Sequence, residues 1–403
     1  MEGWMQERAR RTRNKILDGL VRVLVDNGPA AVTHRSVASA AGVSLAATTR
    51  YFATKDAIIE GLSARTMEGY LSDLTRLMQR MRDGERTGIS TLDDLVMQVV
   101  LNGLTRDRDH SIAWCELILL GARSSSGREL ARDWYDEADR IWQAIGDMLE
   151  TSTRPRCITP TVDRAVGLLF MLHPLAPTRE EARRILAGES KLSEHGLVRE
   201  DDNDDPGSEP RGTKRDLINV AIDLLVREGP SAVTYQAVSQ SAGLSRGAPS
   251  YHFPTVESLM EAAQLALFRR AKTRYRDAFK EFHADRMDPD VLADLTTAIF
   301  FSEAMVHNEE NLAFYSVWVR SAERSALRPP VLKALSDQQE SWGRTLGQMT
   351  DQPPNTFAAM QLQALFLGKL LRAISTASSV GEIARARGHF AMALADLRGA
   401  CEE

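Results

Sequence analysis

The strongest constraint on this chain is an internal repeat. The segment GPAAVTHRSVASAAGVSLAATTRYF, starting at Gly28, aligns without gaps with GPSAVTYQAVSQSAGLSRGAPSYHF, starting at Gly229, and 11 of the 25 positions are identical. The same offset of 201 residues pairs apolar residues upstream, such as Leu17 with Ile218. Because self-similarity at a fixed period marks a duplicated structural unit, the 403-residue chain is predicted to contain two copies of one unit.

A segment of different composition separates the copies. Residues 199–212, REDDNDDPGSEPRG, combine an acidic run with Pro, Gly and Ser. This composition favours a solvated linker, and an acidic docking surface is the alternative. We predict that the linker spans residues 191–212 and separates the two copies.

Both copies are predicted to be all-α, because apolar residues recur at spacings of three and four and alternating strand patterns are scarce. In the first copy, Thr33 stands where an N-cap belongs before HRSVASAA, whose helix ends at Gly42, and Ser44 caps the next short segment. Two helices joined by a short turn that contains glycine form a helix-turn-helix, whose second helix can enter the DNA major groove.

The pentapeptide GLSRG, residues 243–247, offers a competing interpretation, because it matches the G-x-S-x-G nucleophile elbow of serine hydrolases. An elbow follows a strand, whereas the preceding YQAVSQSA has a helical pattern. We therefore expect Ser245 to cap the second recognition helix and not to act as a nucleophile. No triad order, carboxylate pair, phosphate loop or metal-ligand spacing indicates an enzyme, so no catalytic residue, metal or cofactor is expected.

The segments VTHRSVASAAGVSLAATTRYFATKDAII and VTYQAVSQSAGLSRGAPSYHFPTVESLM, each preceded by an apolar helix ending in Gly-Pro, resemble the DNA-binding head of TetR-family transcriptional regulators. The resemblance implies a three-helix DNA-binding head and a larger helical ligand-binding body in each copy. The predicted boundaries are 1–58 (head), 59–190 (body), 213–258 (head) and 259–403 (body). The resemblance also implies that one chain forms, as an intramolecular pseudo-dimer, the two-headed arrangement that a homodimer normally provides.

The resemblance and the helix geometry together suggest which residues touch DNA. Thr33, Thr234 and Lys55 match family positions that approach phosphate, although N-capping alone also explains the two threonines. Val256 replaces the lysine in the second copy, and the family's usual tyrosine is replaced by the shorter Thr49 and Ser250.

Base-reading candidates are the residues expected to be exposed on the second and third helices. These are Arg35, Leu45, Ala46 and Thr48 in the first copy and Gln236, Arg246 and Gly247 in the second. Further candidate DNA contacts are the cap residues Ser44 and Ser245, and Arg11, Arg13 and Lys214 on the first helix of each head. A plain surface position is the alternative for Arg35 and Arg246, and a solubilising tail is the alternative for the arginine-rich N-terminal arm.

Charge agrees with DNA binding by the heads. The chain has a net charge of −5, yet residues 1–55 carry +5 and residues 211–256 carry +2, so the bodies are acidic. No apolar run approaches the ~20 residues that cross a bilayer, and no signal peptide is evident, so a cytoplasmic protein without a membrane partner is expected.

The sequences of the two bodies contain fewer indications of function. Trp114 and Trp142 in the first copy, and Phe314 and Trp318 in the second, are candidates for lining an apolar effector pocket, with plain core as the alternative. The apolar stripes VGLLFMLHPLA and LQALFLGKLLRAI are candidates for the bundle through which the copies pack, or for the internal core of each body.

The sequence therefore predicts a ligand-responsive transcriptional repressor that binds a quasi-palindromic DNA operator with unlike half-sites. A small hydrophobic effector is expected to release it. The protein is expected to be a pseudo-dimeric monomer or a dimer of such chains. The alternative is an interaction protein in which the second head has become a scaffold.

Overall fold

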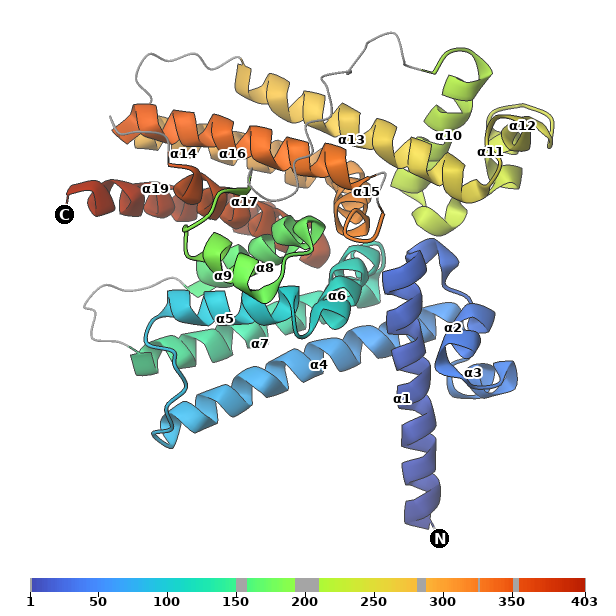
Figure 1. Cartoon of the computed structure of the whole chain (residues 1–403), viewed down its shortest axis with the longest axis horizontal. Coiled ribbons are helices and arrows are strands. Elements are labelled where there is room, and N and C mark those ends of the chain that lie inside the picture. Colours follow the sequence, from blue (N-terminus) through green and yellow to red (C-terminus); the bar gives the residue numbers. More distant parts are fainter. Residues whose placement is uncertain are drawn as a thin grey trace. The chain divides into compact units, whose positions relative to one another are not determined.

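A computed structural model describes residues 2–149, 158–192, 210–280, 288–324, 327–350 and 355–402. Regular structure in these ranges is entirely helical, and no strand occurs among them (Figure 1). The prediction of an all-α fold with a tandem repeat is confirmed.

The helices of the first copy follow one another with short connections. They are α1 (Glu2–Asn27), the 3-10 helix η1 (Pro29–Ala31), α2 (His34–Ala41), α3 (Leu45–Tyr51), α4 (Lys55–Arg82), α5 (Leu92–Leu104), α6 (Arg108–Gly121), α7 (Ser125–Leu149), α8 (Ile158–Leu172), the 3-10 helix η2 (His173–Leu175) and α9 (Arg179–Leu186).

The second copy begins with the same order of elements. Its helices are α10 (Thr213–Arg227), the 3-10 helix η5 (Pro230–Ala232), α11 (Tyr235–Ser241), α12 (Ala248–His252), α13 (Val256–Lys280), α14 (Pro289–Met305), α15 (Asn308–Arg320), α16 (Arg328–Thr350), α17 (Thr356–Thr376), α18 (Val380–Ala384) and α19 (Ala386–Glu402).

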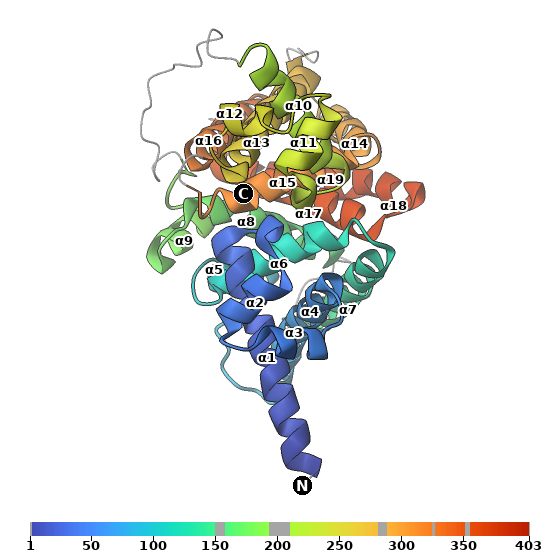
Figure 2. The same cartoon turned by 90° about the vertical axis from the view of Figure 1, so that its right-hand side faces the viewer.

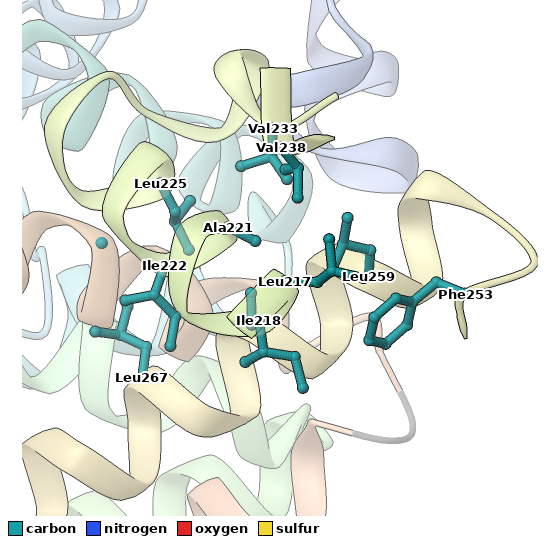
Figure 3. Packing of buried hydrophobic residues seen from close by; sticks show 12 residues of the cluster. Leu217, Ile218, Ala221, Ile222, Leu225, Val233, Val238, Phe253, Leu259 and Leu267 are labelled. Atoms are coloured by element: carbon teal, nitrogen blue, oxygen red, sulfur yellow. The ribbon is translucent and has the colours of Figure 1, made fainter. Parts of the chain in front are cut away.

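The offset of 201 residues carries the core of one head onto the core of the other. Figure 3 shows the second core, in which residues of α10, α11 and α13 gather, with Phe253 at one side of the cluster. Phe253 corresponds to Phe52, which is equally buried. Buried pairs at this offset are Ile16 and Leu217, Leu17 and Ile218, Leu20 and Ala221, Leu24 and Leu225, Val32 and Val233, Val37 and Val238, and Ile58 and Leu259. The repeat in the sequence is therefore a repeat of side-chain packing.

The chain divides into two compact units whose boundary lies within α8. One unit comprises Met1–Ala165 and Ser375–Ala377, and the other comprises Val166–Ile374 and Ser378–Glu403. Within the second unit, α8 meets α17 so closely that a Cβ atom on Gly167 would lie 1.8 Å from the carbonyl oxygen of Ala364. The two apolar stripes noted in the sequence thus pack against each other at this crossing.

Only α17 has the length and composition of a membrane-crossing helix among the residues that the structure describes. Its most apolar window is 72% buried inside the protein. This burial is typical of a core helix, and the close contact between Ala364 of α17 and Gly167 of α8 agrees with it.

Candidate nucleic-acid interface

The turn of each helix-turn-helix is built around a glycine. Gly42 and Gly243 have φ values of +64° and +65°, a left-handed conformation that glycine adopts without a steric penalty. Open space surrounds both positions, since no heavy atom lies within 4 Å of an added Cβ. The backbone conformation, and not crowding, therefore accounts for glycine at this position in both copies.

The first head has the caps that its sequence predicts. The Thr33 hydroxyl accepts a hydrogen bond from the Ser36 amide at 3.0 Å, and the Ser36 hydroxyl accepts one from the Thr33 amide at 2.9 Å. Ser44 caps α3 by accepting from the Ala47 amide at 3.1 Å, and Thr54 caps α4 in the same way. The three helices consequently begin at fixed residues, which sets the side chains that α2 and α3 present.

The second recognition helix differs from the expectation. It begins at Ala248, with Gly247 as its N-cap, so the prediction that Ser245 caps it is wrong. In the first head, the Thr48 amide donates to the Ser44 carbonyl at 3.3 Å, but the corresponding Pro249 has no N–H to donate to Ser245. Proline also disfavours helical geometry at the residue before it, so the five-residue α12 starts later than α3.

Most of the predicted DNA contacts are exposed. Exposed side chains or positions are Arg11, Arg13, Thr33, Arg35, Ser44, Leu45, Ala46 and Thr49 in the first head, and Lys214, Thr234, Gln236, Ser245, Arg246, Gly247 and Ser250 in the second. Thr48 is the exception, because it is fully buried and its hydroxyl donates to the Leu45 carbonyl at 2.7 Å. The expectation that Thr48 is exposed is therefore wrong, since its side chain faces the interior of the head.

Equivalent cations lie over the phenylalanine that ends each recognition helix. The Arg13 guanidinium carbon is 5.0 Å from the centre of the Phe52 ring, and Lys214 Nζ is 5.6 Å from that of Phe253. A cation over an aromatic face is held by the ring quadrupole. These contacts place one positive charge beside the end of each recognition helix.

An additional hydrogen bond joins α11 and α12 in the second head. The Tyr235 hydroxyl, at the start of α11, donates to the Phe253 carbonyl at the end of α12, at 2.5 Å. The offset places His34 at this position in the first head. The bond fixes the orientation of the short α12 against α11.

Lys55 is only half-buried at the start of α4. Burial lowers its pKa, and the neighbouring Asp56 carboxylate acts in the opposite direction. In the second head Val256 takes this position and is 36% exposed. The first head thus has a cation where the second has an apolar surface.

Two exposed residues at the end of the recognition helices were missed by the sequence reasoning. Tyr251 is 85% exposed and packs edge-on against His252, with ring centres 5.1 Å apart. The offset pairs Tyr251 with Arg50, which is also exposed. The sequence repeat could have indicated both residues, because Arg50 directly follows Thr49 and Tyr251 directly follows Ser250 on the equivalent recognition helices.

The predicted pocket residues of the first body belong to an aromatic cluster. Trp134 has ring centres at 5.4 Å from Tyr70, 5.2 Å from Trp114 and 4.8 Å from Tyr135. Trp142 Nε1 donates to the Tyr70 hydroxyl at 3.0 Å, and burial raises the pKa of Tyr70. The indole nitrogen of Trp134 is buried without a hydrogen-bond partner in the part of the chain that the structure describes.

The second body has a corresponding but different cluster. Phe314 stacks on Phe268 with ring centres 5.3 Å apart, and Trp318 lies 5.8 Å from Phe314 and 6.1 Å from Phe268. Each predicted pocket residue is buried, as either a pocket lining or plain core requires. No group of three or more His, Cys, Asp or Glu is placed to hold a metal ion within the described ranges.

Two helix-turn-helix heads with exposed cations define the chain as a DNA-binding regulatory protein. Residues 16–62 and residues 217–263 each match the model of the family described as bacterial regulatory proteins, tetR family. Both heads are therefore TetR-type DNA-binding domains, and the chain carries them as two tandem TetR-like units.

Proposed function

We propose that the protein is a single-chain, two-headed repressor that binds an operator with two unlike half-sites. The observation that carries this proposal is the difference between the exposed residues of the two heads. Arg35 corresponds to Gln236, and Leu45 corresponds to Arg246, at the same offset. Because arginine suits guanine and glutamine suits adenine, the two heads favour different bases.

The proposed mechanism is occlusion. Both heads bind successive major grooves about one helical turn apart and block access of the transcription machinery. The domain limits follow the sequence division, with heads at 1–58 and 213–258 and the linker at 191–212. The chain acts as a 44.7 kDa pseudo-dimeric monomer in the cytoplasm.

The effector in this scheme is a small apolar molecule bound in one or both bodies. The aromatic cluster around Trp134 supports this site, because rings from α4, α6 and α7 meet there. The buried indole N–H of Trp134 is suited to an effector with a hydrogen-bond acceptor. Effector binding shifts the population of head spacings away from the one that fits the operator.

Operator binding by two matched variants tests the proposal. Operator fragments are first selected from random DNA by the full chain, and binding of Arg35→Ala and Arg246→Ala is then measured by fluorescence anisotropy. Each substitution is expected to weaken binding by about 1–3 kcal/mol, roughly 5- to 150-fold, and to relax the base preference in one half-site only. Selection of two identical half-sites would contradict the proposal.

The same pair of variants addresses a scaffold role for the second head. If Arg246→Ala binds as tightly as the unmodified chain while Arg35→Ala does not, the second head is not a DNA reader. The match of residues 217–263 to the same family model favours DNA binding by this head. Light scattering with one operator fragment supplies the stoichiometry, expected to be one chain per operator.

A further inference from the structure

The first helix of the first head is much longer than its counterpart. Helix α1 has 26 residues and α10 has 15. The first residue of α10, Thr213, corresponds to Thr12, and its N-cap Gly212 corresponds to Arg11, which lies inside α1. Figure 1 and Figure 2 show this part of α1 projecting beyond α2, α3 and α4 of its own head. We call residues 6–15 the basic arm.

The basic arm is strongly cationic and solvated. It contains five Arg or Lys residues and one Glu, which gives a charge of +4. Except for the partly buried Ala9 and Thr12, all of its side chains are exposed, and the next residue of α1, Ile16, is buried. At 1.5 Å per residue the arm is about 15 Å long, which spans roughly four base pairs of duplex DNA.

One face of the arm continues from the recognition helix. Arg13 lies over Phe52, which immediately follows α3. Arg10 and Gln6 lie three and seven residues before Arg13, so they share its face of the helix. Lys15 lies on the other side of the helix. The stripe of Gln6, Arg10 and Arg13 therefore leads outward from the end of the DNA-reading element.

The second copy has the opposite charge at this position. The sequence before α10 is DDNDDPGSEPRG, which is acidic, and the N-cap of α10 is Gly212, which has a positive φ of 59°. A negative segment at this position disfavours approach to phosphate. Any contact that the arm makes with DNA is consequently restricted to the side of the first head.

We propose that the basic arm binds the phosphate backbone of duplex DNA flanking the first half-site. The complex thereby has a fixed direction on the DNA. This inference rests on the proposed operator binding. The arm extends the contact by about four base pairs on one side only. Beyond the unlike half-sites, it gives the chain a second means of setting its orientation on the operator, and this means is independent of base sequence.

Trimmed operator fragments test this inference. The full chain is titrated against an operator with about ten flanking base pairs on both sides, and against two fragments in which one or the other flank is removed up to the half-site. Loss of one flank is expected to weaken binding severalfold and to lower the slope of log K against log salt by about 1–2, at roughly 0.9 per phosphate contact. Loss of the other flank is expected to have no effect.

The variant Arg10→Gln assigns the effect to the arm. It is expected to bind the long operator with a salt slope lower by about one and to be less sensitive to the loss of that flank than the unmodified chain. Lys15→Gln removes the same charge from the other side of the helix and is expected to keep the full sensitivity to trimming. Equal effects of the two flanks, or full trimming sensitivity in Arg10→Gln, would overturn the inference. Failure of the unmodified chain to bind any selected operator would instead refute the proposed function.

Discussion

Gly167 is the position where a single methyl group should be most damaging to the second unit. An added Cβ would lie 1.8 Å from the Ala364 carbonyl oxygen, 2.6 Å from the carbonyl carbon and 2.9 Å from Cα. These are backbone atoms, so the contact cannot be relieved by a side-chain rotation, and α8 must move away from α17. Overpacking of this kind costs about 3 kcal/mol at the upper end of its range, whereas the helix propensity of Ala over Gly returns about 1 kcal/mol. Gly167→Ala is therefore expected to destabilise the protein by about 2 kcal/mol.

Urea denaturation followed by far-ultraviolet circular dichroism measures this change. Gly69→Ala is the matched control, because Gly69 lies within α4 and no heavy atom is within 4 Å of its Cβ position. There the same substitution is expected to stabilise the protein by about 0.5–1 kcal/mol. The two variants thus differ in the sign of the effect. A Gly167→Ala protein as stable as Gly69→Ala would refute the reasoning that α8 and α17 are in backbone contact.

Three further outcomes are expected. Hydrogen bonds from the Ser90 and Thr91 amides lower the pKa of Asp94, so its stabilising effect is present above about pH 4 and is lost as the pH falls through the lower folded-state pKa. Asp94→Asn should accordingly lower the urea midpoint at pH 7, and by less as the pH falls through the lower folded-state pKa. Burial raises the pKa of the Cys115 thiol, so Cys115→Ala should leave the number of thiols that react with Ellman's reagent in the native protein unchanged. Pro249→Ala restores an amide hydrogen-bond donor, and hydrogen exchange measured by mass spectrometry should become slower at the start of α12.

The repeat made the heads predictable to the level of single residues. Thr33 and Ser44 cap the helices that the sequence assigns to them, because capping depends on a side chain and an amide three residues away. The two errors in the heads have equally local causes. Thr48 lies on the buried side of α3, where its hydroxyl donates to the Leu45 carbonyl, and Pro249 removes the amide that an earlier start of α12 requires.

The bodies were less predictable because their contacts join residues far apart in the chain. Arg274 of α13 pairs with the buried Glu303 of α14 at 2.9 Å, and Asn311 of α15 donates to the same carboxylate at 2.9 Å. No local sequence pattern predicts either contact. Each of these residues is unremarkable in its own segment. Only the packing of three helices removes the carboxylate from water and makes a charged partner necessary.

The sequence by itself determined that the chain is helical, that it is duplicated and that each copy begins with a helix-turn-helix, since periodicity, caps and turn glycines act over a few residues. The tertiary structure decided which cations lie over Phe52 and Phe253, how far α1 extends from its head and where the compact units divide. The boundary within α8 follows from the crossing at Gly167, where absence of a side chain allows two backbones to meet. A sequence shows the glycine, but only the fold shows what it is packed against.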